Sequence, residues 1–317
     1  MRKNEILEEL EWLLHFKTPI HQIEDEMNNI FVKREELIPF SFGGNKVRIA
    51  ANYFIELISG GYDTVVTYGA STSNLCRVIA SMAKRYDIKC YIISPEEGYY
   101  ETPNSVIVDF LDANIIKCPV ANVSKTIERT LEQLGAKNKP YFIYGGGHGK
   151  AGTDSYRTVL KQIIEYEFEN KITFDYIFIT LATGTSMSGL VVENIIERNN
   201  KNIIGVSVAR EIERAYRILS DAVETYTGKT IDSKEFYIFD NRIGGYGKYD
   251  DTTLDTIRNQ FRRNALNLDT TYTGKGFSGM QKFLMTNEIH NKYVLFIHTG
   301  GTPLFFIDNC KMLKGCK

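Results

Sequence analysis

Short apolar runs alternate along the chain with segments whose apolar residues recur at helical spacing, and this alternation constrains the fold most strongly. The segment 73–86, for example, places Leu75 and Met82 on one face of a helix. The near-continuous apolar runs lie at residues 63–68, 88–94, 114–120, 141–144, 174–182, 203–208, 236–239 and 293–298. Such runs are typical of parallel strands that are covered on both faces. We therefore predict an α/β protein with two three-layer α/β/α lobes, mostly parallel sheets and a ligand cleft between the lobes.

The length of the chain indicates two lobes, because single hydrophobic cores seldom grow beyond about 250–300 residues. The chain has 317 residues, and the glycine-rich stretch 145–152 is a candidate crossing point between lobes. We expect residues 1–44 and 152–317 to form the larger lobe and residues 45–151 the smaller one.

Composition narrows the class of protein. Lys plus Arg number 38 and Asp plus Glu 39, so the chain lacks the basic excess that nucleic-acid binding needs. No apolar run approaches the length of a membrane span, and the charged N-terminal segment predicts an amphipathic helix rather than a signal peptide. The five cysteines and five histidines show no metal-binding spacing. We expect a cytoplasmic protein with reduced thiols, no metal and no membrane partner.

Segment 181–190, LATGTSMSGL, follows a predicted strand and opens a predicted helix. Its small and hydroxyl-bearing residues suit an anion, because backbone N–H groups at a helix start attract phosphate. An ordinary capped loop explains the same composition equally well. A dinucleotide-binding loop would need glycine at Ser186, and the stretch around Lys150 lacks the pattern of a nucleotide P-loop.

Lys46 follows two glycines and an asparagine at the start of a predicted helix. The helix dipole disfavours a cation there, which would lower the pKa of the ammonium group. A lysine that readily loses its proton can react with a carbonyl group. Contact with a bound phosphate would explain the same position, and the residues alone leave both interpretations open.

Several motifs occur in an order that resembles a known family: VKREELIPFSFGGNKVR, TSN, GTSMSGL, GGYGKY, TYTGKGFSG and HTGGTPLF. From about Thr18 to Phe305, the chain is similar to the pyridoxal-phosphate family of D-cysteine desulfhydrase and 1-aminocyclopropane-1-carboxylate deaminase. That family has the tryptophan synthase β-subunit fold, also called fold type II. The resemblance implies pyridoxal 5'-phosphate as the cofactor and a small amino acid as the substrate, and we also expect a homodimer.

The resemblance also implies roles for individual residues. Lys46 would bind the cofactor covalently and move the substrate's Cα proton. Asn74 would bond to the phenolic oxygen of the cofactor, and Ser73 would face the substrate carboxylate or assist proton transfer. The phosphate would be held by Thr183, Gly184, Thr185 and Ser186.

Three more residues complete the expected site. Tyr246 and Tyr272 would stand near the substrate, although core packing is an alternative for tyrosines in a chain that has 19 of them. Thr299 would lie near the pyridine nitrogen of the cofactor.

Departures from the family pattern bear on the substrate. The chain has Thr72, Leu75 and Ile49 where the family usually has other residues, and Thr273 where the deaminase branch carries glutamate. A hydroxyl near the pyridine nitrogen is a weaker electron sink than a carboxylate, which suits loss of a β-substituent better than opening of a cyclopropane ring.

We therefore expect a pyridoxal-phosphate-dependent lyase that resembles D-cysteine desulfhydrase and releases a keto acid and ammonia. The alternatives are a β-replacement synthase of the same cofactor class and a non-catalytic α/β module that binds a phosphorylated metabolite.

Overall fold

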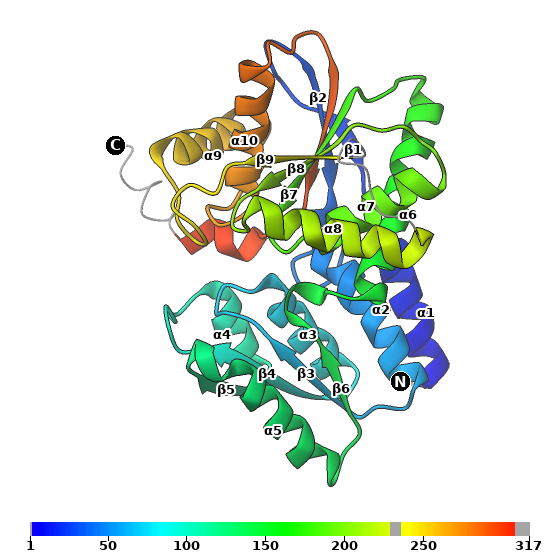
Figure 1. The fold of residues 1–317 in the computed structure, drawn as a ribbon, viewed down its shortest axis with the longest axis vertical. Helices are drawn as coiled ribbons and strands as arrows, with labels where there is room; N and C mark the ends of the chain where they lie inside the picture. Colours follow the sequence, from blue (N-terminus) through cyan, green and yellow to red (C-terminus); the bar gives the residue numbers. More distant parts are fainter. Residues whose placement is uncertain (1, 229–235, 308–317) are drawn as a thin grey trace. The chain divides into compact units, whose positions relative to one another are not determined.

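The computed structural model describes residues 2–228 and 236–307 (Figure 1). Contacts divide the chain into two compact units. The first unit comprises Met1–Phe16, Pro39–Ser41 and Lys46–Gly152, and the second comprises Lys17–Ile38, Phe42–Asn45 and Thr153–Lys317. The prediction assigned residues 1–44 to the larger lobe, whereas the structure groups residues 1–16 with the first unit.

Arg48 explains why the N-terminal helix belongs to the first unit. Its fully buried guanidinium donates hydrogen bonds to the carbonyl oxygens of Leu14 (2.7 Å) and Phe16 (2.6 Å), at the C-terminal end of α1 (Lys3–His15). The last carbonyls of a helix have no partner within the helix and favour a cation. Leu10 and Leu13 of α1 are completely buried, so the helix is part of this unit's core.

A six-stranded sheet forms the centre of the second unit, in the order β1-β2-β10-β7-β8-β9. Only the β1–β2 pair is antiparallel, and every other neighbouring pair is parallel. Phe296 of β10 is in register with Val32 of β2 and Phe178 of β7. The strands are β1 (Ile20–Gln22), β2 (Asn29–Arg34), β7 (Tyr176–Leu181), β8 (Ile203–Ser207), β9 (Tyr237–Asp240) and β10 (Tyr293–His298).

Helices cover both faces of this sheet (Figure 1). One face packs against α6 (Lys150–Asn170), α7 (Thr185–Ile196) and α8 (Ile212–Thr227), which contribute Leu160, Leu190 and Leu219 to a common core. The other face packs against α9 (Asp251–Asn264) and α10 (Thr273–Thr286), where Phe277 and Met280 are fully buried. The unit therefore has the three layers that its apolar strands predicted.

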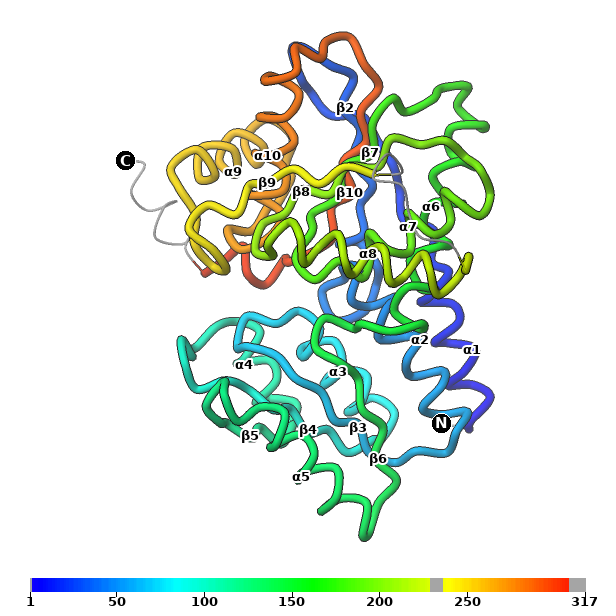
Figure 2. Tube along the Cα trace, in the orientation of Figure 1, coloured from blue at the N-terminus to red at the C-terminus, as the bar shows by residue number. Residues whose placement is uncertain are grey.

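The first unit has a four-stranded parallel sheet in the order β5-β4-β3-β6, and the strands lie side by side in that order in Figure 2. Helix α3 packs on β3 and β4, and α5 places Ile127 and Leu131 against Val66 and Ile93 of the sheet. The strands are β3 (Thr64–Tyr68), β4 (Lys89–Pro95), β5 (Asn114–Cys118) and β6 (Pro140–Ile143). The helices are α2 (Asn45–Ser59), α3 (Asn74–Arg85), α4 (Pro103–Phe110) and α5 (Val123–Gly135), with short 3-10 turns η1 (Glu35–Leu37), η2 (Val120–Asn122) and η3 (Gly145–Gly147).

The sequence pattern did not predict strands β1 and β2. Strand β2 contains Lys33, whose charge interrupts the apolar run. The Lys33 ammonium is fully buried and donates to Thr18 Oγ1 (2.8 Å) and Gln162 Oε1 (3.0 Å), and it lies 3.7 Å from a Glu35 carboxylate oxygen. A buried lysine needs such partners, and they come from distant parts of the chain that no local pattern reveals.

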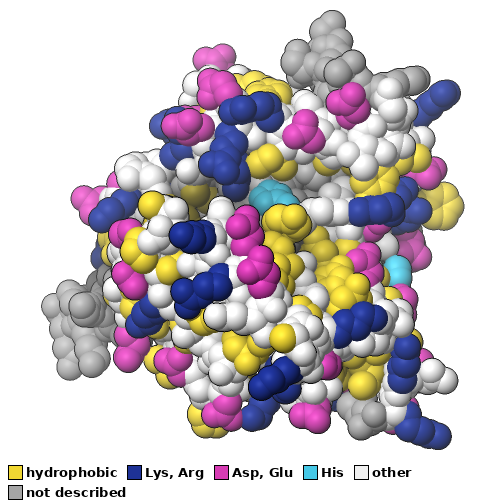
Figure 3. Space-filling model, turned by 60° about the horizontal axis from the view of Figure 1, so that its bottom comes forward, with side chains coloured by type: hydrophobic (Ala, Val, Ile, Leu, Met, Phe, Trp, Pro, Cys, Tyr) yellow, Lys and Arg dark blue, Asp and Glu magenta, His cyan; other side chains and the backbone are white. Residues whose placement is uncertain are grey.

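The surface carries charges of both signs. Basic and acidic side chains are interspersed over the face drawn in Figure 3. Within residues 2–228 and 236–307, no helix is long and apolar enough to cross a bilayer, and no cluster of His, Cys, Asp and Glu could hold a metal ion. Cys76, Cys90 and Cys118 are free and buried, whereas Cys310 and Cys316 lie outside the described residues.

Candidate active site

Lys46 is the second residue of α2 and is partly buried. Its ammonium group donates one hydrogen bond, to the carbonyl oxygen of Gly146 (2.9 Å). Burial lowers the pKa of Lys46 to about 8. The sequence predicted the direction of this shift but attributed it to the helix dipole, whereas the cause is desolvation. The neutral, nucleophilic amine is therefore far more populated near neutral pH than in an ordinary lysine, although the ammonium form still predominates at pH 7.

Asn45, the residue before Lys46, links two other predicted site segments within the second unit. Its backbone N–H donates to Thr299 O (2.9 Å), and its side-chain amide donates to Ser186 Oγ (2.8 Å). Gly44 makes this approach possible, because a Cβ atom there would lie 3.0 Å from Thr299 O, and its φ is +102°. Within the second unit, Asn45 is thus held by the residue that follows β10 and by the β7–α7 loop.

Ser73 and Asn74 begin α3 in the first unit. Ser73 is the N-cap residue, and its hydroxyl accepts a hydrogen bond from Cys76 N (3.2 Å). Asn74 Oδ1 accepts a hydrogen bond from Asn104 Nδ2 (2.9 Å). Among the described residues, the Nδ2 group of Asn74 has no hydrogen-bond partner. The side chain is therefore oriented by one end and free to donate from the other, as a bond to a phenolic oxygen requires.

The first turn of α4 holds this loop in place, which the sequence analysis missed. Asn104 is 1% exposed and also donates to Thr72 O (3.0 Å), while Thr102 Oγ1 donates to Ser71 O (2.6 Å). The Thr-Pro pair at 102–103 signals a helix start, because threonine caps helices and proline suits their first turn. No local pattern indicates that the cap reaches a loop some thirty residues earlier in the chain.

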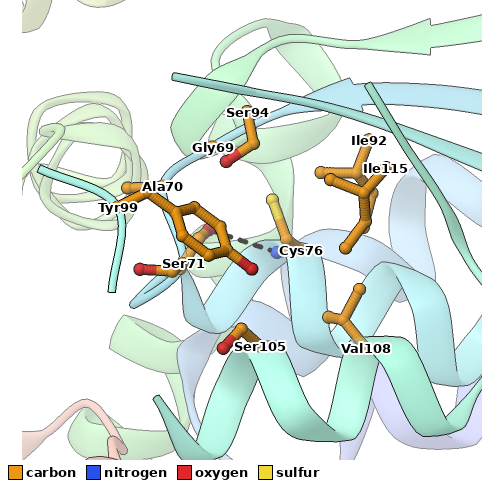
Figure 4. A pocket seen from close by; sticks show the side chains of 11 residues that line it. Gly69, Ala70, Ser71, Cys76, Ile92, Ser94, Tyr99, Ser105, Val108 and Ile115 are labelled. Carbon is orange, nitrogen blue, oxygen red and sulfur yellow. Dashed lines mark hydrogen bonds between the residues drawn. The ribbon is translucent and has the colours of Figure 1, made fainter. Parts of the chain in front are cut away.

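A small pocket, partly open to solvent, lies behind the same loop (Figure 4). Its lining combines serine hydroxyls with apolar side chains: Gly69, Ala70, Ser71, Ser73, Cys76, Ile92, Ser94, Tyr99, Ser105, Val108 and Ile115. The Cys76 thiol points into it. Burial raises the pKa of Cys76 to about 11, so this thiol stays protonated near neutral pH and is a poor nucleophile.

The β7–α7 loop has the geometry of a phosphate cradle within the second unit. Gly184 is the N-cap residue of α7 and has φ +97°, a conformation that favours glycine. The hydroxyl oxygens of Thr183 and Thr185 lie 3.4 Å apart beside it, and Ser186 Oγ accepts from Asn45. The N–H groups that begin α7 have no partner within the helix, and they suit an anion.

Tyr246 and Tyr272 form a pair in the second unit. Their hydroxyl oxygens are 2.6 Å apart, and their rings meet edge to face with centroids 5.9 Å apart. Tyr246 is 46% exposed, so core packing does not explain it. Tyr272 is partly buried against the α9–α10 core, and its backbone N–H donates to Asp269 Oδ1 (2.7 Å).

Thr273 does not have the free hydroxyl that its sequence position suggested. The residue is fully buried, and its Oγ1 donates to Asp269 Oδ2 (2.7 Å) while accepting from Asp269 N (2.9 Å). Burial is the largest influence on Asp269 and raises the pKa of its carboxyl group. Thr273 therefore secures the start of α10, and Thr299 is left as the predicted hydroxyl partner for a pyridine nitrogen. Thr299 follows β10, is 9% exposed and has no hydrogen-bond partner for its hydroxyl among the described residues.

Each unit thus offers groups that fit pyridoxal 5'-phosphate. The first unit supplies a partly buried amine at Lys46 and an unused amide donor at Asn74. The second unit supplies the helix-start cradle at 183–186 and the hydroxyl of Thr299.

Comparison with known proteins also indicates a pyridoxal-phosphate enzyme. A family model described as pyridoxal-phosphate dependent enzyme matches residues 12–300. A 1-aminocyclopropane-1-carboxylate deaminase of Variovorax paradoxus is 27% identical over 296 residues, or 87% of each chain. A Pyrococcus abyssi protein provisionally given the same name is 29% identical over 314 residues, covering 95% of this chain and 94% of that one.

A crystal structure described as an ACC deaminase homologue superposes with a TM-score of 0.83 at 24% identity, covering 95% of this chain and 94% of that chain. This likeness confirms the predicted α/β fold with mostly parallel sheets. The family match covers most of the sequence and includes nearly all of the residues described above. The chain therefore belongs to the pyridoxal-phosphate dependent enzyme family, and its cofactor is pyridoxal 5'-phosphate.

Proposed function

We propose that this enzyme is a lyase that removes the β-substituent of a small amino acid, as D-cysteine desulfhydrase does, and releases a keto acid and ammonia. One observation carries the choice of reaction. No carboxylate follows Tyr272, and the residue there, Thr273, is bonded to Asp269. A hydroxyl at Thr299 would then face the pyridine nitrogen, and it would withdraw less charge than a carboxylate.

In the proposed reaction, Lys46 removes the Cα proton of the substrate and the β-substituent leaves. Bound pyridoxal phosphate stabilises negative charge at the substrate's Cα. The Lys46 amine, once released by the substrate, takes the Cα proton, and its pKa of about 8 suits a base that works near neutral pH. The electron pair of the Cα–H bond forms a Cα–Cβ double bond as the bond from Cβ to the leaving group breaks. Water then converts the released enamine to the keto acid and ammonia.

The remaining residues bind, orient or move protons. Ser73 binds the substrate carboxylate, Asn74 orients the cofactor ring and the 183–186 loop binds its phosphate. The hydroxyl of Tyr272, hydrogen-bonded to that of Tyr246, gives a proton to the leaving group. Reduced, widely spaced cysteines support a cytoplasmic location, and we propose a homodimer as the assembly.

A second candidate is the ring opening of 1-aminocyclopropane-1-carboxylate. The names of the curated relatives favour it. The two reactions share the cofactor but not the first step, because Cα of 1-aminocyclopropane-1-carboxylate carries no hydrogen for Lys46 to remove. In this chain, the missing carboxylate after Tyr272 is the feature that favours loss of a β-substituent over ring opening.

A substrate panel tests the choice. We expect pyruvate from D-cysteine or another small amino acid with a β-leaving group, and little ketobutyrate from 1-aminocyclopropane-1-carboxylate. Keto acid production is measured for D- and L-amino acids at equal concentration, with borohydride-reduced enzyme as the inactive control. Efficient ketobutyrate formation would instead support the second candidate.

The pH dependence of cofactor capture tests the state of Lys46. Because the neutral amine is the nucleophile, capture of pyridoxal phosphate by the cofactor-free protein should rise about tenfold per pH unit below 8 and level off above it. The absorbance of the covalently bound cofactor reports the rate. Nα-acetyl-lysine amide, with an ordinary lysine pKa, is the control, and its rate should keep rising beyond pH 9. A protein rate that rises in the same way would contradict the lowered pKa.

Tyr272→Phe tests the role of the phenol. The ring and its packing stay, but the hydroxyl is lost, so we expect turnover to fall by about 10²–10⁴-fold if the phenol moves a proton. The absorbance of the bound cofactor should be unchanged. Tyr176→Phe is the matched control, because Tyr176 is also partly buried against the α9–α10 core. Wild-type turnover in Tyr272→Phe would shift the proton-donor role to Tyr246 or Ser73.

A further inference from the structure

Lys275, in the first turn of α10, is fully buried. Its ammonium donates to three backbone carbonyl oxygens, those of Val208 (2.6 Å), Arg242 (2.5 Å) and Gly245 (2.9 Å). A neutral amine has only two hydrogens, so three donated bonds require the charged form. No ion pair joins Lys275 to a carboxylate within the described part of the chain. A buried positive charge is therefore stabilised by carbonyl dipoles.

The carboxylates near Lys275 do not neutralise its charge by direct contact. Burial lowers its pKa to about 8, and the carboxylates of Asp250 and Asp240 act in the opposite direction without contacting it. Asp240 is paired with Arg242, and Asp250 caps α9. Both carboxylates are thus occupied elsewhere. A ring of carbonyl oxygens is also how proteins bind alkali cations such as K⁺.

Two of the three carbonyls, those of Arg242 and Gly245, belong to a glycine-rich loop, whereas Val208 directly follows β8. Residues 241–250 join β9 to α9, and Ile243, Gly244, Gly245 and Gly247 all have positive φ. Two backbone hydrogen bonds within the loop use the same carbonyls: Gly245 N donates to Arg242 O at 3.1 Å, and Lys248 N donates to Gly245 O at 3.3 Å. Lys275 therefore holds both acceptor residues of this turn at once.

Tyr246 directly follows Gly245 in this loop, and its partner Tyr272 lies just before Lys275. The start of α10 thus contacts the loop twice, through the phenol pair and through the ammonium. A third bond, from Asn241 Nδ2 to Lys275 O (2.8 Å), secures the loop where it leaves β9.

We propose that the Lys275 ammonium is a built-in monovalent cation that holds the 242–247 loop and so positions the Tyr246 hydroxyl against Tyr272. The statement that Lys275 positions Tyr246 rests on the proposed function of the tyrosine pair. The statement that the carbonyls of Val208, Arg242 and Gly245 form a binding site for a monovalent cation, here called the cation site, does not. Lys275 is a positioning residue in this account. When its side chain is removed, the three carbonyls should accept K⁺ in its place.

Amide hydrogen exchange of the cofactor-loaded protein tests the proposal, with KCl compared against tetramethylammonium chloride at equal ionic strength. In the wild type, exchange at Gly245 and Lys248 should be the same in both salts. In Lys275→Ala, exchange at these amides should be faster by about tenfold in tetramethylammonium chloride and return toward the wild-type rate in KCl. Turnover should follow the same pattern. Lys275→Met, which fills the space without a charge, should exchange fast in both salts.

The controls distinguish a local effect on the 242–247 loop from a general loss of structure. Lys282→Ala removes an exposed lysine from the same helix and should change nothing. If the Gly245 and Lys248 amides of Lys275→Ala exchange at the wild-type rate in tetramethylammonium chloride, Lys275 does not hold the loop. If K⁺ does not restore protection of these amides, or if the variant folds in neither salt, the three carbonyls do not form a cation site. A protein that shows the expected exchange but makes no keto acid would disprove the proposed function alone.

Discussion

Parallel strand order is the constraint on which the rest of this structure depends. In a parallel sheet, every strand delivers its following loop to the same edge, and ligands bind there. In the second unit, β7 is followed by the 183–186 cradle, β9 by the Tyr246 loop and β10 by Thr299. In the first unit, β3 is followed by Ser73 and Asn74, and β6 by the glycine turn that accepts the Lys46 bond. Residues that are distant in sequence are thus gathered by sheet topology.

Lys46 and Lys275 differ in the number of hydrogen bonds that each ammonium group donates, and this difference separates a reactive lysine from a structural one. Burial lowers the pKa of both Lys46 and Lys275 to about 8. Lys46 has a single carbonyl acceptor, so loss of a proton leaves its bond to Gly146 intact and frees a lone pair. Lys275 has three acceptors and would lose one of its bonds on deprotonation. Its positive charge is thus part of the fold, whereas that of Lys46 can be given up for reaction.

Much of the fold and part of the site could be predicted from the sequence, because strand loops and helix starts have local signatures. The apolar runs predicted β3 to β10, and GGNK and GTSMSGL marked two helix starts that the structure contains. Strand β2 was missed because Lys33 is buried among partners from elsewhere in the chain. Asn104, Asp269 and Lys275 were missed for a related reason. Each acts through long-range or backbone contacts that leave no periodic pattern.

The proposed chemistry depends on which lysine binds the cofactor covalently, and this lysine can be identified by chemical labelling. Borohydride reduction of the purified enzyme fixes the bound cofactor on its lysine, and peptide mapping then locates it. We expect the pyridoxyl group on the peptide that contains Lys46. A label on Lys275 or on Lys150 would contradict it, because the first is held as a charged structural group and the second lies outside the GGNK helix start.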